Sequence, residues 1–159
     1  MPPTFQAGGF DCGVPSINAA LEGELQQAMR ELRVSAWTLD RAGQVIGFMA
    51  LRNGELPIDS IDRIRTAPNL TKGTAPVVHL ELVAVQSKFQ RQGYGEILLE
   101  YAVDSALEVN KWSAARFLSL DATPAARDFY ERNGFFVATI QPSGGTTLML
   151  LDLSPFTPI

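Results

Sequence analysis

Apolar residues recur along this chain with two periods, one typical of helices and one typical of strands. Residues 77–85 carry apolar side chains on both faces of an extended chain, which predicts a central strand covered on both sides. Helical spacing runs over 15–32, where Pro15 suits a first turn, and again over 93–109. The pattern therefore predicts a fold that mixes helices and strands.

Turn residues mark the remaining elements. Thr123 before a proline predicts an N-cap, and Asn133-Gly134 predicts the end of that helix. Residues 52–75 predict a long connection with a short helix near 58–65, and we expect the first strand, before residue 10, to be very short or missing. The predicted elements are a helix at 15–32, strands at 34–39, 44–51 and 77–85, a helix at 93–109, a strand at 115–120, a helix at 123–132, and strands at 135–140 and 146–153 joined by a turn around 143–145. This order predicts one α/β domain over 1–159, with a mixed central β-sheet flanked by helices.

Composition limits the classes of protein that this chain can be. It has 13 Lys and Arg against 17 Asp and Glu, so a formal charge of −4 gives no overall attraction for nucleic acid. Cys12 is the one cysteine and His79 the one histidine, which excludes an internal disulfide and a multi-histidine metal site. The sequence has no signal-peptide pattern and no apolar run long enough to span a bilayer, so we expect a cytoplasmic protein without a membrane partner.

Two glycines stand where the 77–85 strand leads into the next helix, in the stretch FQRQGYGEILLEYA from residue 89. The first turn of a helix leaves N–H groups without partners, and its dipole adds partial positive charge. Glycine lets the main chain approach a ligand because it has no Cβ. We therefore predict an anion site suited to a phosphate or diphosphate, with Lys88 and Arg91 adding positive charge. The P-loop and dinucleotide-binding patterns are absent, and a tightly packed turn without a ligand is the alternative.

Val85 followed by QRQGYG, residues 90–95, resembles the acetyl-CoA loop of the GNAT acetyltransferase superfamily. ARDFYERNGF, residues 126–135, resembles a second signature of that family, in the expected order and spacing. The resemblance implies acetyl-CoA as cosubstrate, with its diphosphate on the amides of 90–95 and its pantetheine arm along 83–85. One departure is Thr123, where many members carry an asparagine near the cofactor. The implied cofactor-binding residues are Val83, Ala84, Val85, Gln90, Arg91, Gln92, Gly93, Tyr94, Gly95, Thr123 and Phe129.

The same resemblance implies an N-acetyltransferase that passes the acetyl group directly to a primary amine in a ternary complex. Tyr130 is implied as the proton donor to the departing thiolate, and a phenol near pKa ~10 is close to a thiol near ~8.5. Glu81 or His79, directly or through water, is the candidate base, and the histidine starts nearer neutrality. The main-chain N–H groups near 83–85 are implied as donors to the oxyanion. The alternative is structural: a core tyrosine bound to the main chain, and two polar residues hydrogen-bonded on a sheet face.

FDCG at 10–13, followed by Ile17, Asn18 and Leu21, resembles the start of the GNAT toxins of bacterial toxin–antitoxin modules. That resemblance implies aminoacyl-tRNA as acceptor and an antitoxin protein as partner. The acidic balance of the chain favours a small-molecule or peptide amine instead, and so does Glu81, because the toxin group usually lacks a carboxylate there. A CoA-binding module without turnover is a third alternative, and a homodimer is common in the family.

Overall fold

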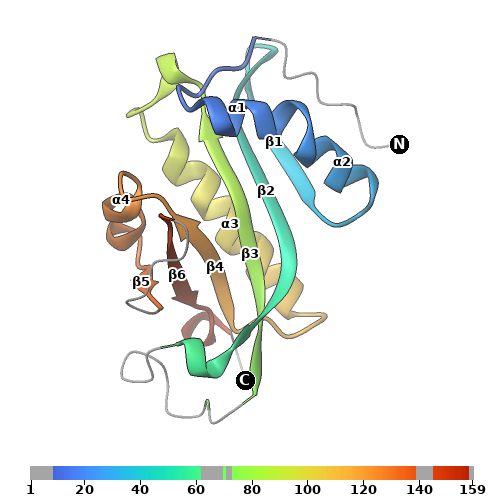
Figure 1. Ribbon diagram of the computed structural model, residues 1–159, viewed down its shortest axis with the longest axis vertical. Helices are drawn as coiled ribbons and strands as arrows, with labels where there is room; N and C mark the ends of the chain where they lie inside the picture. Colours follow the sequence, from blue (N-terminus) through green and yellow to red (C-terminus); the bar gives the residue numbers. More distant parts are fainter. Residues whose placement is uncertain (1–8, 62–69, 71–72, 139–144, 158–159) are drawn as a thin grey trace. The chain divides into compact units, whose positions relative to one another are not determined.

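A six-stranded mixed sheet carries the fold, with its strands in the hydrogen-bonded order β1-β2-β3-β4-β6-β5 (Figure 1). The computed structural model describes residues 9–61, 70, 73–138 and 145–157. Strand β1 pairs antiparallel with β2, β3 pairs parallel with β4, and β6 pairs antiparallel with β4 and β5. The helices and strands are α1 (Pro15–Glu22), α2 (Glu24–Arg30), β1 (Ser35–Arg41), β2 (Gln44–Pro57), β3 (Thr74–Val85), α3 (Tyr94–Asn110), β4 (Phe117–Ala122), α4 (Arg127–Arg132), β5 (Phe136–Val137) and β6 (Thr147–Asp152). The predicted α/β class with a mixed sheet and flanking helices is confirmed.

The chain divides into two compact units, and strands β2 and β3 each contribute to both. The first unit contains Met1–Arg52 and Glu81–Ala102, and the second contains Asn53–Leu80 and Val103–Ile159. Predicted functional residues fall in both units, so each unit is described by itself. That residues 1–159 act as one domain stays a prediction.

In the first unit, helices cover both faces of the sheet. Helices α1 and α2 place Leu21 and Leu25 in one buried cluster with Phe48 of β2. The neighbouring Gly47 faces the other way, because a Cβ on it would lie 3.0 Å from Cδ1 of Leu98 in α3. Glycine at this position therefore lets α3 approach the sheet closely.

The single helix predicted over 15–32 is two helices. Gly23 interrupts the helix at φ −126° and ψ −84°, as the low helix propensity of glycine allows. The apolar spacing continues across the break because both helices contact the same cluster. The predicted helix also extended too far, to Leu32, which lies beyond α2, is 90% exposed and takes a left-handed φ of 56°.

Ala42 and Gly43 both have positive φ, as a two-residue hairpin turn between β1 and β2 requires.

The region predicted as a connection over 52–75 is shorter than expected. Strand β2 then continues to Pro57, and a 3-10 turn follows at Ile58–Ser60. The short helix predicted near 58–65 ends before Ile61, which is extended, and residues 62–65 lie outside the described residues, as do 1–8 and most of the predicted turn at 143–145.

The second unit has its own apolar core, centred on Val77 of β3 and Phe117 of β4. The predicted cap at Thr123 was wrong, because α4 begins only at Arg127 and has Ala126 at its N-cap position without a side-chain cap. The carbonyl of Thr123 instead accepts a hydrogen bond from the N–H of Ala126 at 3.0 Å, which closes a turn before the helix. In the predicted strand at 135–140 only β5 is found, and residues 139–140 lie outside the described part.

Candidate active site

The turn into α3 presents main-chain donors without protein partners. Arg91 at φ 59° and Gly93 at φ 88° both take the left-handed conformation before the helix begins at Tyr94. Within the described part of the chain, the N–H groups of residues 91–96 donate no hydrogen bond. A Cβ built on Gly93 would meet nothing within 4 Å, so the space beside its amide is open. Free amides at a left-handed turn and a helix N-terminus suit an anion, and these residues therefore fit a diphosphate.

Three cations belong to this turn or touch it. Lys88 and Arg91 lie within it, and Nη1 of Arg41 donates a hydrogen bond to the hydroxyl of Tyr94 at 3.0 Å. None of the three forms an ion pair with a carboxylate among the residues that the structure describes. Their positive charge is therefore available to a ligand at the turn.

The N-terminal segment braces this turn from outside. The N–H and Oγ of Ser87 donate to the carbonyl of Asp11 at 2.8 and 3.0 Å. Nε2 of Gln90 donates to the carbonyls of Cys12 and Val85, both at 2.8 Å. The side chain of Gln90 thus joins the FDCG segment to the end of β3, and these hydrogen bonds support the shape of the turn.

Asn18 completes this brace. Its Oδ1 accepts the N–H of Cys12 at 3.1 Å, and its Nδ2 donates to Oδ1 of Asp11 at 2.8 Å. The N–H of Gly13 also donates to that carboxylate, and these two hydrogen bonds hold the pKa of Asp11 below its usual value. Cys12 is buried, with Sγ 3.2 Å from Oδ1 of Asn18, which agrees with a small packed side chain rather than a nucleophile.

The amide of Gln90 differs from those that follow it. Its N–H donates to the carbonyl of Ser87 at 3.3 Å, so the run of free donors begins at Arg91. Nε2 of Gln92 donates to the carbonyl of Lys88 at 3.2 Å within the turn. Both glutamine side chains therefore shape the turn, while contact between Gln90 and a cofactor stays a prediction.

Strand β3 offers a second set of main-chain groups next to the turn. Its register with β4 is limited to Val77–Leu80, which pair with Phe117–Leu120. Beyond Leu80, no strand in the described part of the chain pairs with that edge of β3. The edge at residues 83–85 can therefore accept an extended ligand arm through main-chain hydrogen bonds, as a neighbouring strand would.

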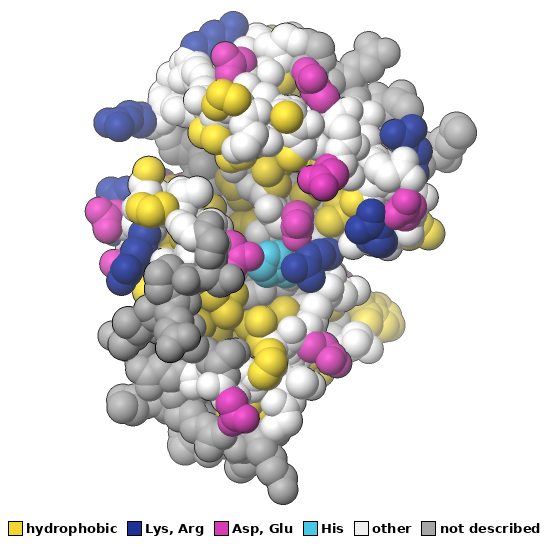
Figure 2. Space-filling model, viewed as in Figure 1, with side chains coloured by type: hydrophobic (Ala, Val, Ile, Leu, Met, Phe, Trp, Pro, Cys, Tyr) yellow, Lys and Arg dark blue, Asp and Glu magenta, His cyan; other side chains and the backbone are white. Residues whose placement is uncertain are grey.

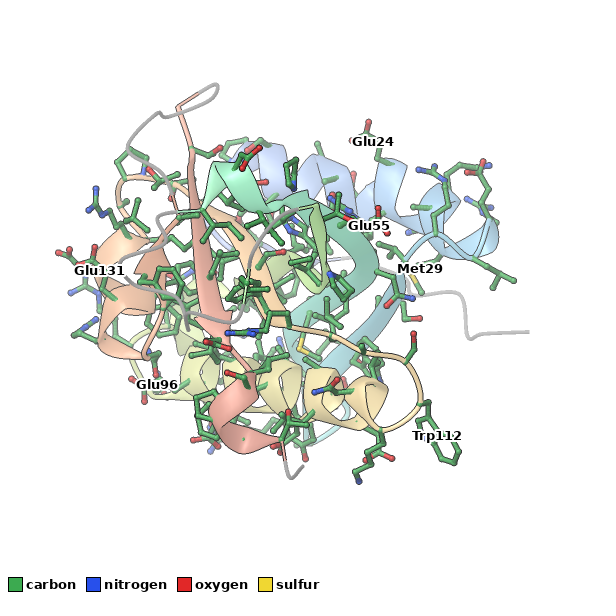
Figure 3. The ribbon with its side chains drawn as sticks, turned by 90° about the horizontal axis from the view of Figure 1, so that it is seen from below. Glu24, Met29, Glu55, Glu96, Trp112 and Glu131 are labelled. Atoms are coloured by element: carbon green, nitrogen blue, oxygen red, sulfur yellow. The ribbon has the colours of Figure 1, made fainter. Side chains whose placement is uncertain are left out.

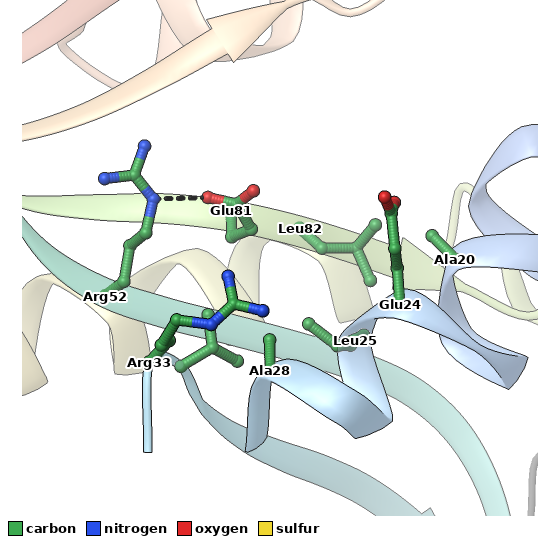
Figure 4. A pocket seen from close by; sticks show the side chains of 9 residues that line it. Ala20, Glu24, Leu25, Ala28, Arg33, Arg52, Glu81 and Leu82 are labelled. Atoms are coloured by element: carbon green, nitrogen blue, oxygen red, sulfur yellow. Dashed lines mark hydrogen bonds and ion pairs between the residues drawn. The ribbon is translucent and has the colours of Figure 1, made fainter. Parts of the chain in front are cut away.

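Glu81 lies in the first unit and forms an ion pair. Its Oε2 is 2.7 Å from Nε of Arg52, and the two side chains are each 42% exposed (Figure 4). The carboxylate of Glu81 is therefore held in an ion pair and is open to solvent. Glu81 can attract an ammonium group and receive a proton through water, which suits an acceptor that loses its proton easily.

His79 lies in the second unit inside a hydrogen-bonded cluster. Its Nδ1 is 2.8 Å from Oγ of the fully buried Ser119, and its Nε2 is 3.6 Å from Oδ2 of Asp121. The ring is buried, and the part of it that reaches the surface is the cyan patch in the face drawn in Figure 2. With groups facing both nitrogens, His79 resembles the expected structural alternative more than a base open to a substrate.

Tyr130 lies on α4, with its ring between two phenylalanines. The ring centroids of Phe129 and Phe135 are 5.2 and 5.7 Å away in edge-on arrangements. Burial raises the pKa of Tyr130 to about 12. The hydroxyl donates to no residue in the described part of the chain, so the expected bond to the main chain is not found there.

The raised pKa makes Tyr130 a weaker proton donor than the sequence alone suggests. At about 12 the phenol keeps its proton at every physiological pH, but it is a weaker acid than the value near 10 had suggested. Proton transfer from Tyr130 to a thiolate near 8.5 is then less favourable than a phenol pKa near 10 had suggested.

The site residues predicted from the sequence are divided between the units. The first unit holds Glu81, Val83, Ala84, Val85, Gln90, Arg91, Gln92, Gly93, Tyr94 and Gly95, and the second holds His79, Thr123, Phe129 and Tyr130. Sequence reasoning missed Arg41, Arg52, Ser119 and Asp121. Each of these residues contacts a partner that lies 29 to 53 residues away in the sequence, and a short sequence motif cannot predict such a contact.

Comparison with known proteins identifies the family. The chain matches the model of the acetyltransferase (GNAT) family over residues 11–135. It therefore belongs to the GNAT family, and it is an acyltransferase that uses acetyl-CoA as acetyl donor. No curated protein matches it significantly. Within the described residues, no helix combines the length and apolarity needed to cross a bilayer.

Solved structures resemble the chain over nearly its whole length. A bacterial toxin is 26% identical, with a TM-score of 0.80, and the match covers 96% of this chain and 86% of the toxin. AtaT complexed with acetyl-methionyl-tRNAfMet is 20% identical, with a TM-score of 0.83 and coverages of 96% and 90%. AtaTR bound with AcCoA is 21% identical, with a TM-score of 0.76 and coverages of 97% and 90%. The two matches at 20% and 21% identity show a shared fold.

Proposed function

We infer that the acceptor is the α-amino group of an aminoacyl-tRNA, as in a toxin-type acetyltransferase. The observation that carries this proposal is the match to a bacterial toxin at 26% identity over 96% of the chain. AtaT, a structural neighbour, has been solved with acetyl-methionyl-tRNAfMet, which is the product of such a reaction.

The N-terminal segment supports the same acceptor class. FDCG and Asn18 carry the sequence resemblance to the toxins, and here they hold the turn into α3 through Ser87 and Gln90. The toxin-like residues of this segment therefore have a structural role, because they hold the turn that is expected to bind acetyl-CoA. This role makes their resemblance to the toxin group more informative than a similar match in an exposed tail without contacts.

The ion-paired, solvent-exposed position of Glu81 also favours an α-amine. A lysine-type amine has a pKa of about 10.4, whereas an α-amino group lies at about 7.7–8.0 and is partly neutral at physiological pH. Glu81, exposed and paired with Arg52, is suited to guide such an amine and to pass its proton to water. An α-amino group is therefore easier to deprotonate than a lysine side chain, and it reacts without a strong base.

In the proposed reaction, the neutral amine attacks the thioester carbonyl and forms the amide bond as the C–S bond breaks. The N–H groups along 83–85 donate to the oxyanion. Tyr130 gives its hydroxyl proton to the leaving sulfur, and the proton lost by the amine goes to water near Glu81. The products are CoA and the acetylated amine, and Tyr130 regains a proton from solvent.

A second candidate is a small-molecule or peptide amine, which the formal charge of −4 favours because nucleic acid prefers basic surfaces. An antitoxin partner, a homodimer and a cytoplasmic location belong to the proposal as well.

The test measures thiol release from acetyl-CoA with charged tRNA, uncharged tRNA, short peptides and simple amines at equal amine concentration. The proposal expects turnover with charged tRNA that exceeds the peptide rate by at least about tenfold in kcat/KM and vanishes with uncharged tRNA. Equal or faster turnover of simple amines or peptides would assign the second candidate instead.

A further inference from the structure

Arg41 brings a cation to the turn into α3 from a different part of the first unit. It is the last residue of β1 and directly precedes the hairpin turn at Ala42 and Gly43. Its Nη1 donates a hydrogen bond of 3.0 Å to the hydroxyl of Tyr94, which lies 53 residues further along the chain and is the first residue of α3. Both residues belong to the first unit. Strand pairing therefore places a guanidinium beside the helix start whose amides are free.

The guanidinium of Arg41 can bind a ligand while it keeps its contact with Tyr94. An arginine side chain has five N–H groups, and that contact uses one of them. Within the part of the chain that the structure describes, this exposed arginine forms no ion pair. Figure 3 shows Glu96, the acidic residue in the first turn of α3, projecting outward from the helix start, and this carboxylate is not paired with Arg41. Because a guanidinium matches a phosphate with two parallel hydrogen bonds, Arg41 is suited to bind one.

Aromatic rings beside Arg41 hold its partner in position. The ring of Tyr94 meets that of Phe89 edge-on, with the centroids 6.2 Å apart. Nζ of Lys88 is 5.3 Å from the centroid of the Phe89 ring, so a second cation contacts the same aromatic pair. Tyr94 is half-buried, and its hydroxyl therefore gives Arg41 an acceptor of fixed direction.

Acetyl-CoA presents phosphate at two places. The amides of 91–96 fit its diphosphate, and a separate phosphate monoester lies on the 3′ carbon of its ribose. A phosphate monoester carries a charge of about −1.5 to −2 at neutral pH, so charge-assisted hydrogen bonds from a cation favour its binding. The ribose between the two phosphates has about the length of a tyrosine side chain, which here separates the amide of Tyr94 from Arg41. A ligand with its diphosphate at the turn can therefore bring its 3′-phosphate to Arg41.

We propose that Arg41 binds the 3′-phosphate of the acetyl donor, that Tyr94 positions the guanidinium, and that this contact selects CoA over donors without that phosphate. Such donors are dephospho-CoA and the phosphopantetheine arm of a carrier protein. The inference rests on the proposed function only in placing the diphosphate at 91–96, and it does not depend on the acceptor. Arg41 touches no reacting atom, so its role is in affinity and in the choice of donor.

Calorimetry measures the Kd of CoA and of dephospho-CoA, which differ only in the 3′-phosphate. The wild type should bind CoA at least about tenfold more tightly, because hydrogen bonds to a charged group contribute enough for such a ratio. Arg41→Gln should weaken CoA binding about tenfold and leave the Kd of dephospho-CoA within about twofold. Equal affinity of the wild type for the two ligands, or equal losses for both in Arg41→Gln, would overturn the inference.

Matched variants separate this contact from general charge. Arg30→Gln removes the same charge from an exposed site on α2 and should leave the ratio of the two Kd values unchanged. Lys88→Gln removes a cation from the turn itself and should weaken both ligands alike, with the same ratio. Tyr94→Phe keeps the ring but loses the acceptor of Arg41, and it should lower the ratio a few-fold. If Arg41→Gln does not fold, Tyr94→Phe decides, and an unchanged ratio there contradicts the proposal.

The outcomes also separate this inference from the proposed function. A ratio that falls in Arg41→Gln, together with charged tRNA that is not acetylated, would overturn the tRNA acceptor while keeping the phosphate contact. Charged tRNA acetylated with equal kcat/KM from acetyl-CoA and from acetyl-dephospho-CoA would overturn the phosphate contact while keeping the tRNA acceptor.

Discussion

The turn into α3 and the α4 segment carry the two sequence signatures of the family, but they are built in different ways. At the turn, the groups proposed to bind acetyl-CoA are main-chain amides of residues 91–96, held in place by hydrogen bonds from Ser87 and Gln90. At α4, the proposed proton donor is one side chain, Tyr130, held by ring contacts with Phe129 and Phe135.

This difference says where each region is sensitive to change. Main-chain donors survive most side-chain substitutions, so the turn depends on backbone conformation and on its brace. The proposed proton transfer at α4 depends on one group, the hydroxyl of Tyr130, and no neighbouring side chain is proposed to replace it. Substitutions that change the backbone conformation of the turn or remove its brace should therefore change the affinity for acetyl-CoA, and loss of the Tyr130 hydroxyl should change the rate of transfer.

The largest effect is expected for Tyr130→Phe. Loss of the proton donor should lower kcat by about 10²- to 10⁴-fold and leave the Kd for acetyl-CoA within about twofold. Steady-state kinetics and calorimetry measure the two quantities. Tyr101→Phe, on an exposed tyrosine of α3, is the control and should keep full activity. An unchanged kcat in Tyr130→Phe would remove this residue from the mechanism.

Gly93→Ala should reverse that pattern. A side chain at φ 88° costs about 1–2 kcal/mol, so the turn will relax and the Kd for acetyl-CoA should rise about tenfold, with kcat at saturation nearly unchanged. Gly73→Ala is a matched control, because Gly73 has φ 96° and equally open space. Both variants should lose stability in denaturant titrations, and equal affinity for acetyl-CoA in both would refute the special role of Gly93.

Removing the brace should have an intermediate effect. Gln90→Leu loses two hydrogen bonds of 2.8 Å to main-chain carbonyls, and should lower the free energy of unfolding by about 1–2 kcal/mol and weaken acetyl-CoA binding a few-fold. Gln92→Leu loses one exposed bond of 3.2 Å and should change both quantities less. Equal free energies of unfolding and equal acetyl-CoA affinities in the two variants would mean that the N-terminal segment does not support the turn.

The smallest effect concerns the ionisation of Tyr130. Its pKa is about 12 in the folded chain against 10.0 for a free phenol, so the folded state holds this proton more tightly. The resulting stability is complete below about pH 10 and is lost as the pH rises toward 12. The phenolate absorbance is measured as the pH is raised, in the wild type and in Tyr130→Phe. The difference between the two curves should show one phenol ionising near pH 12. Phenolate near pH 10 would indicate an exposed ring.

The sequence predicted the parts of this molecule that local patterns encode. The strand ending at Val85, the turn at Gly93 and the segment around Tyr130 each follow from contiguous residues whose spacing has a direct physical meaning. The break at Gly23 was missed because the apolar spacing continues through it, as both helices contact one cluster.

Contacts between distant segments could not be predicted in the same way. Arg41 reaches Tyr94, Arg52 reaches Glu81, and Ser119 reaches His79 only after the strands have paired. The raised pKa of Tyr130 also comes from burial, which a motif does not report.

The central claim is that the free amides of residues 91–96 hold the diphosphate of acetyl-CoA. The most direct measurement follows the main-chain amide signals of isotope-labelled protein while CoA, or pantetheine without the diphosphate, is added. We expect CoA to produce its largest shifts at 91–96 and to slow hydrogen exchange there, and pantetheine to do neither. CoA binding that leaves these amides unchanged, or pantetheine shifts of equal size, would contradict it.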